Sequence, residues 1–275
     1  MQKDQNGIYV NEKEQQVTTA FTGKAQDDLF DIEDNSWWFR YRAKIILCLL
    51  DEFFKKDKKV VDIGGGNGYT TLQMQKSGYD AGVLEPSYEA CLNARRRGVS
   101  LAMCGTIGDL DFKPAQCTLL DVLEHIENDE GFLRTVYENT EPDGVLLITV
   151  PAFQCLWSSE DDQAGHFRRY TRKQLLSAVS KGGFEAVYCN YFFSFLFLPI
   201  LLVRVGFEKL GILKRTEDRN EQQQKEIRDQ QFRQRGGIVG LGLSILTGIE
   251  HRLVKKHIPV LFGSSIICVL RKKQA

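Results

Sequence analysis

The chain has 275 residues, of which 43% are hydrophobic and 26% are charged, an ordinary composition for a globular protein. Lysine plus arginine and aspartate plus glutamate number 36 each, so the formal net charge is zero. This balance argues against a dedicated nucleic-acid-binding protein, which would carry a basic excess or a basic stripe. No nucleic-acid partner is therefore expected.

The N-terminal residues are polar and contain no apolar run of the kind that a secretory signal needs, so a cytoplasmic location is expected. The seven cysteines are scattered along the chain, and none forms a CxxC pair. This pattern predicts free thiols in a reducing compartment, and no metal site is predicted from it.

Strand and helix patterns alternate along most of the chain. Residues 1–28 are polar and are expected to form a flexible arm, and residues 29–56 show helical spacing of apolar positions. Seven later runs are short and apolar, as buried strands are, and lie at 58–63, 81–85, 99–103, 116–122, 144–150, 184–192 and 264–272. Helices are expected between them, at 69–77, 87–97, 128–140 and 172–181, with N-caps at Asn128 and Thr171. The alternation predicts a parallel sheet with helices on both faces.

Residues 191–250 interrupt this alternation and are expected to form a helical insertion or cap before a final strand in 251–275. Segments 191–205 and 236–249 are apolar, and the residues between them are strongly polar. The first segment is too short to span a bilayer. Three interpretations stay open for it: a core helix, a cap over an apolar acceptor, or, together with 236–249, peripheral contact with a membrane surface.

A glycine-rich loop follows the first of these strands. Its D-x-G-x-G-x-G pattern comprises Asp62, Gly64, Gly66 and Gly68. Glycines permit positive φ and a close approach of the backbone to a ligand, and the helix that follows presents free N–H groups. The dinucleotide pattern G-x-G-x-x-G would need a glycine where Tyr69 stands, so an NAD-dependent oxidoreductase is kept only as an alternative.

Two further motifs stand at the ends of later strands. Glu85 ends the second strand about 20 residues past the loop, where a carboxylate can accept the ribose hydroxyls of an adenosine cofactor. The run Asp121-Val122-Leu123-Glu124-His125-Ile126 closes the fourth strand. In this order and spacing, the three motifs resemble the class I S-adenosylmethionine-dependent methyltransferases. The D-V-L-E-H-I run is similar to that of the subgroup that includes quinone-biosynthesis O-methyltransferases.

The resemblance implies a Rossmann-like, doubly wound α/β core over residues 29–190, with S-adenosylmethionine as cofactor. Its sheet would be mixed and seven-stranded, with the last strand antiparallel, and would carry an N-terminal helical lid and the C-terminal helical insertion. The glycine loop would surround the methionine part of the cofactor, and Glu85 would bind the ribose. Thr106 stands where such enzymes often place an acidic residue near the adenine, and Asp109 is a poorer candidate there. Asp121 would lie close to the reactive methyl group.

The segment Trp37–Arg42 is similar to the W-W-F-x-x-R opening of many such methyltransferases. There a helix covers the cofactor and an arginine pairs with its carboxylate, which implies that role for Arg42 ahead of Arg40. An amphipathic helix with solvent-exposed arginines is the alternative.

The candidates for acid–base chemistry are two histidines. His125 and His166 are candidate general bases toward an acceptor hydroxyl, with Asp121 beside them, although His125 is equally suited to ordering its loop. A divalent metal held by the carboxylate–histidine cluster is a minor alternative. Arg168 and Arg169 are candidates for binding an anionic group of the acceptor, or are part of a surface loop.

The expected function is methyl transfer to a small-molecule acceptor, with oxygen as the preferred acceptor atom and an apolar or lipid-linked compound as one candidate class of acceptor. A non-catalytic S-adenosylmethionine-binding regulator is the second alternative, because the same cofactor pocket would serve it. The oligomeric state is not predicted.

Overall fold

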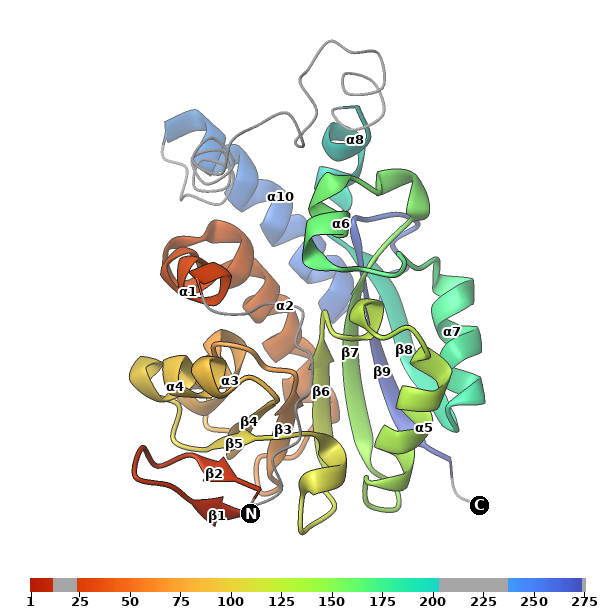
Figure 1. Cartoon of the computed structure of the whole chain (residues 1–275). Coiled ribbons are helices and arrows are strands. Elements are labelled where there is room, and N and C mark those ends of the chain that lie inside the picture. Colours follow the sequence, from red (N-terminus) through yellow and green to blue (C-terminus); the bar gives the residue numbers. More distant parts are fainter. Residues whose placement is uncertain (12–23, 203–236, 274–275) are drawn as a thin grey trace.

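A nine-stranded mixed sheet forms the centre of the computed structural model, which describes residues 1–11, 24–202 and 237–273 (Figure 1). The strand order is β1-β2-β5-β4-β3-β6-β7-β9-β8. The strands are β1 (Gln2–Lys3), β2 (Tyr9–Val10), β3 (Val60–Ile63), β4 (Ala81–Glu85), β5 (Ala102–Cys104), β6 (Gln116–Leu120), β7 (Val145–Pro151), β8 (Phe184–Phe192) and β9 (Ser265–Lys272).

The α/β Rossmann-like architecture is confirmed, but the expected count of seven strands is wrong. All seven expected strands are present, and β9 is antiparallel to both of its neighbours, β7 and β8. The two additional strands come from the segment expected to be an arm: β1 and β2 form a short hairpin, and β2 pairs in parallel with β5. Two-residue strands leave no periodicity in the sequence, because pairing of so few residues depends on the neighbouring edge. The division of the chain into arm, core, insertion and final strand stays a prediction.

Helices cover both faces of the sheet. They are α1 (Lys24–Asn35), α2 (Trp37–Phe53), α3 (Tyr69–Lys76), α4 (Tyr88–Arg97), α5 (Asp129–Glu138), α6 (Ser159–Ala164), α7 (Arg172–Lys181), α8 (Ser194–Leu201) and α10 (Gly237–Lys255). Three single-turn 3-10 helices follow strand ends: η1 (Ile107–Asp109), η2 (Leu123–His125) and η3 (Gln154–Leu156). The caps predicted at Asn128 and Thr171 are confirmed, since each side chain accepts a hydrogen bond from a backbone N–H of the first turn.

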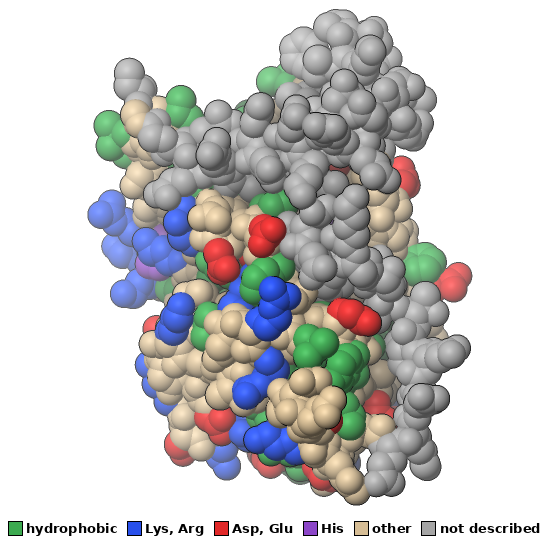
Figure 2. Space-filling view, turned by 60° about the vertical axis from the view of Figure 1, so that its left-hand side comes forward, with side chains coloured by type: hydrophobic (Ala, Val, Ile, Leu, Met, Phe, Trp, Pro, Cys, Tyr) green, Lys and Arg blue, Asp and Glu red, His purple; other side chains and the backbone are tan. Residues whose placement is uncertain are grey.

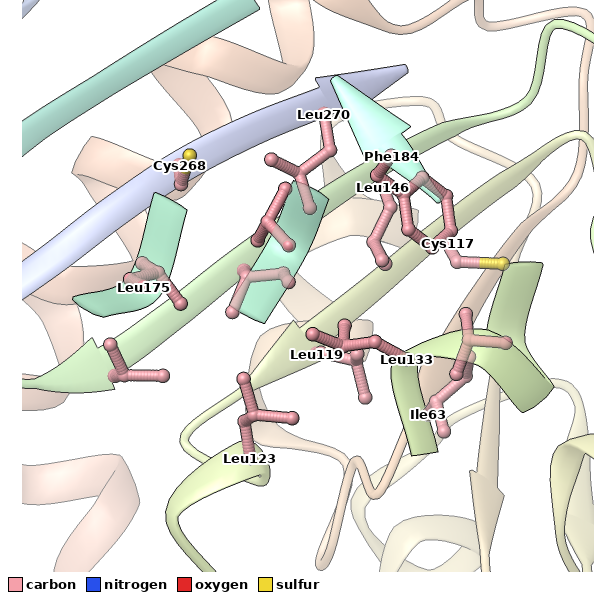
Figure 3. Close-up of a cluster of buried hydrophobic side chains, with 14 of the residues drawn as sticks. Ile63, Cys117, Leu119, Leu123, Leu133, Leu146, Leu175, Phe184, Cys268 and Leu270 are labelled. Carbon is pink, nitrogen blue, oxygen red and sulfur yellow. The ribbon is translucent and has the colours of Figure 1, made fainter. Parts of the chain in front are cut away.

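Two apolar layers hold the helices to the sheet. Side chains of α2, α3 and α10 pack on one face, where Ile45, Met74 and Val254 are fully buried. Side chains of α5 and α7 pack on the other face against a cluster that includes Ile63, Leu119, Leu133, Leu146, Leu175, Phe184 and Leu270 (Figure 3). Because successive residues of a strand point to opposite faces, the largely buried strands β6 and β7 contribute side chains to both layers.

The described parts of the expected insertion are α8 and α10, which lie at one end of the molecule (top of Figure 1). Tyr191 and Phe192 belong to β8, so the apolar segment 191–205 is part strand and part helix. No residue of α8 is buried, which argues against a core helix there. Residues 203–236 lie outside the described residues. Among the helices that the structure describes, none is long and apolar enough to cross a membrane.

Candidate active site

The glycine loop joins the end of β3 to the start of α3 through three left-handed residues. Gly64, Gly66 and Gly68 have φ of +69°, +52° and +72°. A Cβ on Gly64 would stand 2.7 Å from Val122 Cγ2, and a Cβ on Gly68 would stand 2.8 Å from Ala94 Cβ. A Cβ on Gly66, in contrast, would meet no atom of the described residues within 4 Å. The first and third glycines therefore serve close packing, and Gly66 leaves space open in front of the loop.

Asp62 is a buried anchor beneath this loop. In the sheet it is directly opposite Thr118, whose hydroxyl donates to Asp62 Oδ1 at 2.6 Å. The hydroxyl of Thr71 donates to Oδ2 at 2.7 Å. Burial raises the pKa of Asp62, and the two hydroxyl donors oppose that shift. The carboxyl group therefore ties β3 to β6 and α3 through the two hydroxyl groups.

Glu85, at the end of the neighbouring strand β4, holds the backbone of Gly66 in place. Its Oε2 accepts the backbone N–H of Gly66 at 3.1 Å, and its Oε1 accepts the N–H of Ser87 at 3.0 Å. The side chain is buried, which raises its pKa, whereas the two backbone donors lower it. A carboxylate has about four acceptor positions, so two remain for further donors.

Thr106 and Asp109 hydrogen-bond to each other at the start of η1. Asp109 Oδ2 accepts the backbone N–H of Thr106 at 2.8 Å and its hydroxyl at 2.7 Å, which is a capping box at the start of η1. Asn11 donates to the other oxygen of Asp109 at 2.9 Å. The N-terminal hairpin is thereby connected to the loop after β5, a link that the sequence did not reveal.

Arg42 and Asp121 meet at the end of β6. Arg42 Nη2 lies 2.8 Å from Asp121 Oδ2 and donates to the hydroxyl of Thr149 at 3.0 Å. The same hydroxyl donates to Asp121 Oδ1 at 2.9 Å, closing a ring of three side chains. Arg42 is buried and lies under the ring of Trp38, whereas Arg40 is exposed. Of the two arginines, Arg42 is therefore the one that faces the strand ends.

A second arginine, which sequence reasoning missed, holds α1 over the glycine loop. Arg97, the last residue of α4, donates to the backbone carbonyl of Asn67 at 2.8 Å and to that of Phe30 at 2.8 Å. It also pairs with Glu33 on α1. In the sequence Arg97 ends a run of three arginines at a helix C-terminus, which is typical of a solvated end, so no local signal marked it.

The structure brings the two predicted histidines together. His125, in η2 just after β6, and His166, 41 residues later, have ring centroids 4.7 Å apart at an interplanar angle of 75°. Glu124 is buried beside them, and one donor atom from each of these three residues lies within 4.8 Å of the others. Burial, and then the neighbouring His166, lower the pKa of His125 to about 4, so its ring is neutral at neutral pH.

Asp161 orients His166 and was also missed by the sequence analysis. His166 Nδ1 lies 2.8 Å from Asp161 Oδ1, and Arg169 contacts the same oxygen at 2.8 Å. Burial alone would raise the pKa of Asp161, but the bonds from His166 and Arg169 outweigh it and lower the pKa to about 2. Asp161 is therefore ionised, and Nδ1 of His166 is the donor. The only local pattern around it is the S-x-x-D capping box at Ser158, which is typical of a helix start and does not indicate a partner for His166.

Both arginines of the 165–171 loop are held in internal ion pairs, which argues against the anion-binding role suggested by the sequence. Arg169 is engaged by Asp161, and Arg168 pairs with Asp129 at 2.9 Å. Arg168 also donates to the carbonyl of Glu127 at 2.6 Å. These internal pairs hold the loop against α5 and η2.

The fold and site define a Rossmann-like protein whose site residues gather at the carboxyl ends of its central strands, where such folds bind nucleoside-containing cofactors. The model of the methyltransferase domain family matches residues 36–188, more than half of the chain. The chain belongs to this family, so the expected class is confirmed and its cofactor is S-adenosylmethionine. The similarity to the quinone-biosynthesis subgroup stays a prediction.

Solved structures share the fold at low sequence identity. A chain of the complex between the Haloferax volcanii Trm112 methyltransferase activator and its putative methyltransferase is 16% identical, with a TM-score of 0.55 over 90% of this chain and 94% of that chain. The plantazolicin methyltransferase BamL, solved with a desmethyl-plantazolicin analogue and S-adenosylhomocysteine, is 11% identical, with a TM-score of 0.52 over 92% of each chain.

Haemonchus contortus phosphoethanolamine N-methyltransferase 2, solved with S-adenosylmethionine, is 16% identical, with a TM-score of 0.53 over 93% of this chain and 58% of that one. At such identities the shared feature is the fold alone. No curated protein sequence matches the chain.

Proposed function

We propose that the chain transfers a methyl group from S-adenosylmethionine to an oxygen atom of a small-molecule acceptor. The observation that carries this proposal is the pairing of two features at one sheet edge. The glycine loop follows β3 and is held by Glu85 at the end of β4. His125 follows β6, and the ring of His166 packs against it. A cofactor held at the first feature would present its methyl group toward the second.

The cofactor is assigned to the loop by the open space at Gly66 and the two spare acceptor positions of Glu85. The methionine part would lie in front of Gly66, and the ribose hydroxyls would donate to Glu85. The Thr106 hydroxyl is occupied as a donor by Asp109, so it would meet the adenine amine only as an acceptor. Arg42 and Asp121 would border the reactive end of the cofactor.

Methyl transfer is an in-line displacement at carbon, in which the acceptor oxygen attacks, the carbon–sulfur bond breaks and S-adenosylhomocysteine leaves. The protein contributes mainly the alignment of the two reactants. An acceptor hydroxyl must lose its proton as the new bond forms, and we assign this step to the histidine pair. Asp161 fixes the orientation of His166, as a carboxylate does for histidine in hydrolase triads.

An apolar acceptor is favoured by the side chains around α8 and α10. The exposed large hydrophobic residues there include Leu198, Leu202, Val239, Leu241, Ile245, Ile249, Leu261 and Phe262. Hydrophobic side chains are also visible at the upper left of Figure 2. Exposed apolar patches are typical of surfaces that bind ligands, proteins or membranes.

Isothermal titration with S-adenosylhomocysteine tests the cofactor assignment. Wild-type protein is expected to bind, and Glu85→Gln is expected to bind at least about tenfold more weakly, because an amide offers ribose one acceptor oxygen instead of two. Glu89→Gln, on the exposed side of α4, is the matched control and is expected to bind as wild type. Equal binding by Glu85→Gln and wild type would contradict the assignment.

Transfer of radiolabelled methyl from S-adenosylmethionine to hydroxylated apolar compounds then tests the activity itself. Binding of S-adenosylhomocysteine without transfer to any hydroxyl acceptor would favour the non-catalytic regulator. Binding of NADH instead would favour the oxidoreductase alternative, which the family assignment leaves without support.

The membrane-surface interpretation of α8 and α10 is tested by co-sedimentation with lipid vesicles. The double variant Leu241→Ser/Ile245→Ser removes two side chains that are 64% and 55% exposed on α10. It is expected to lower vesicle binding if the helix contacts lipid. Val187→Ser, which changes an exposed apolar residue of β8, is the control. If the wild type does not bind vesicles, an apolar acceptor remains as the explanation for the exposed hydrophobic side chains of α8 and α10.

A further inference from the structure

We propose that Glu124, His125 and His166 bind a divalent first-row transition-metal ion, of the class of Zn²⁺, Mn²⁺ and Co²⁺, at the carboxyl end of β6. One donor atom from each residue lies within 4.8 Å of the other two. A single ion coordinated at the usual distances of about 2.0–2.2 Å separates its ligand atoms by about 3–4 Å, so small side-chain rotations complete the site.

The buried carboxyl group of Glu124 is the second observation that points to a ligand. Glu124 is 1% exposed, and no donor in the described part of the chain reaches its Oε2 atom. A buried polar atom without a partner destabilises the fold, and such atoms are rare unless an ion or water satisfies them. Because an oxygen of the same carboxyl group is one of the three clustered donor atoms, a cation bound by this carboxyl group would satisfy it.

The hydrogen bond of His166 supports the same conclusion. Its Nδ1 donates to the ionised carboxylate of Asp161, which leaves Nε2 with its lone pair free to coordinate. Histidines that bind metals almost always donate the other ring nitrogen to a carboxylate or carbonyl, which fixes the tautomer and the ring orientation. Asp161 is 1% exposed and is itself held by Arg169, so this second layer is rigid.

The local charges also leave room for a cation. Arg42 and Arg169, the two arginines whose charges act on Glu124, are each paired with another carboxylate: Arg42 with Asp121, and Arg169 with Asp161. In the described part of the chain, the buried carboxyl group of Glu124 is therefore left beside the two rings without an arginine as its ion-pair partner. Two imidazole nitrogens and one carboxylate oxygen favour Zn²⁺, Mn²⁺, Co²⁺ or Fe²⁺ over Ca²⁺ and Mg²⁺, which prefer oxygen ligands.

Such an ion would have open coordination positions toward the acceptor, a consequence that rests on the proposed function. An acceptor hydroxyl that coordinates the ion becomes more acidic and loses its proton to water. The resulting oxyanion attacks the methyl carbon, and the carbon–sulfur bond breaks to give S-adenosylhomocysteine. His166 would then act as a ligand and not as the base.

The test uses the untagged full chain, stripped with a chelator and dialysed separately against Zn²⁺, Mn²⁺, Co²⁺ and Mg²⁺. Bound metal is measured by mass spectrometry, the affinity by titration, and ligation by the visible absorption of Co²⁺. We expect one transition-metal ion per chain, an increase in melting temperature on binding, and little retention of Mg²⁺. Absence of bound metal for all four cations would overturn the proposal.

Variants assign the ligands. Glu124→Gln and His166→Ala are expected to lower the affinity at least about tenfold, and Asp161→Asn about 10–100-fold, because it removes the support of His166. His257→Ala is the matched control, since His257 also lies 2.9 Å from a carboxylate, that of Glu52, but outside the cluster. Equal metal binding by His166→Ala and wild type, with one ion per chain in both, would place the ion elsewhere and overturn the proposal.

Titration with S-adenosylhomocysteine in the same samples separates this proposal from the proposed function. Cofactor binding by each variant also shows that it is folded. Cofactor binding without metal binding would overturn the metal site and leave the methyltransferase assignment standing. Metal binding without cofactor binding would support the metal site and contradict the proposed function.

Discussion

The second glycine of the loop, Gly66, offers the sharpest test of where the cofactor lies. Replacing it with alanine places a methyl group at a residue with φ of +52°, where no atom of residues 1–11, 24–202 and 237–273 lies within 4 Å. The left-handed conformation costs an L-residue about 1–2 kcal/mol, and no steric clash adds to this cost. If the methionine part of the cofactor lies in front of Gly66, the new methyl group occupies the same space. We therefore expect binding of S-adenosylhomocysteine to weaken at least about tenfold.

Gly78→Ala is the matched control for this effect. Gly78 has φ of +87°, and an added Cβ there also meets no described atom within 4 Å, but it lies between α3 and the start of β4, not at the carboxyl ends of the strands. Both variants should lose the same 1–2 kcal/mol, or roughly 2–4 °C of melting temperature per kcal/mol in a domain of this size. Only Gly66→Ala should lose affinity in isothermal titration.

The adjacent Gly65 provides the opposite case. A Cβ there would stand 2.6 Å from Val83 Cγ2 and 2.8 Å from Asp62 Oδ2, so Gly65→Ala should destabilise the fold by more than either variant above. Wild-type affinity in a folded Gly66→Ala variant would refute the reasoning, because the space in front of the loop would then not hold the cofactor.

Three further predictions concern stability and are measured by urea unfolding. Leu119→Ala removes a fully buried side chain from the cluster of Figure 3 and should cost about 2–5 kcal/mol; a loss well under 1 kcal/mol would contradict this packing. Thr118→Val removes a hydroxyl donor from the buried Asp62 and should cost about 1–3 kcal/mol, and an unchanged midpoint would contradict it. Burial raises the pKa of Asp161, but the bonds from His166 and a neighbouring arginine have the larger effect and bring the pKa down to about 2. The resulting stabilisation is complete above the unfolded pKa of about 3.8 and is lost as the pH falls through about 2. Asp161→Asn should therefore cost about 2 kcal/mol at pH 7 and progressively less toward pH 2, whereas a difference independent of pH would contradict the ion pair.

The sheet and the order of the cofactor motifs were predictable because their signals are local. Strands buried on both faces are continuous apolar runs, and the positions of Gly64, Glu85 and Asp121 follow directly from where those strands end. The hairpin of residues 2–10 gave no such signal, because two-residue strands have no periodicity and depend on the exposed edge of β5. The same limit explains why the strand count was too low.

The partners of the site residues were less predictable than the residues themselves. His166 was a candidate because of its position in the loop. Asp161 lies in an S-x-x-D pattern that is typical of a helix start, and nothing in that pattern indicates that it also accepts a hydrogen bond from His166. Arg97 looked like a solvated helix end, yet it reaches the backbone of Asn67. Each of these contacts depends on how α1, α4 and α6 pack over the strand ends, which no spacing within one segment encodes.

Arg42 and Asp121 were expected to have separate roles, one toward the carboxylate of the cofactor and one near its methyl group. In the structure they form one unit, because Thr149 accepts from Arg42 and donates to Asp121 while the two charges lie 2.8 Å apart. Asp121 also has φ of +58°, a conformation that costs a non-glycine residue about 1–3 kcal/mol and persists only where its surroundings hold it. Removing the arginine would therefore release the aspartate as well. The position of α2 over the site and the shape of the end of β6 are thus coupled through a single ion pair.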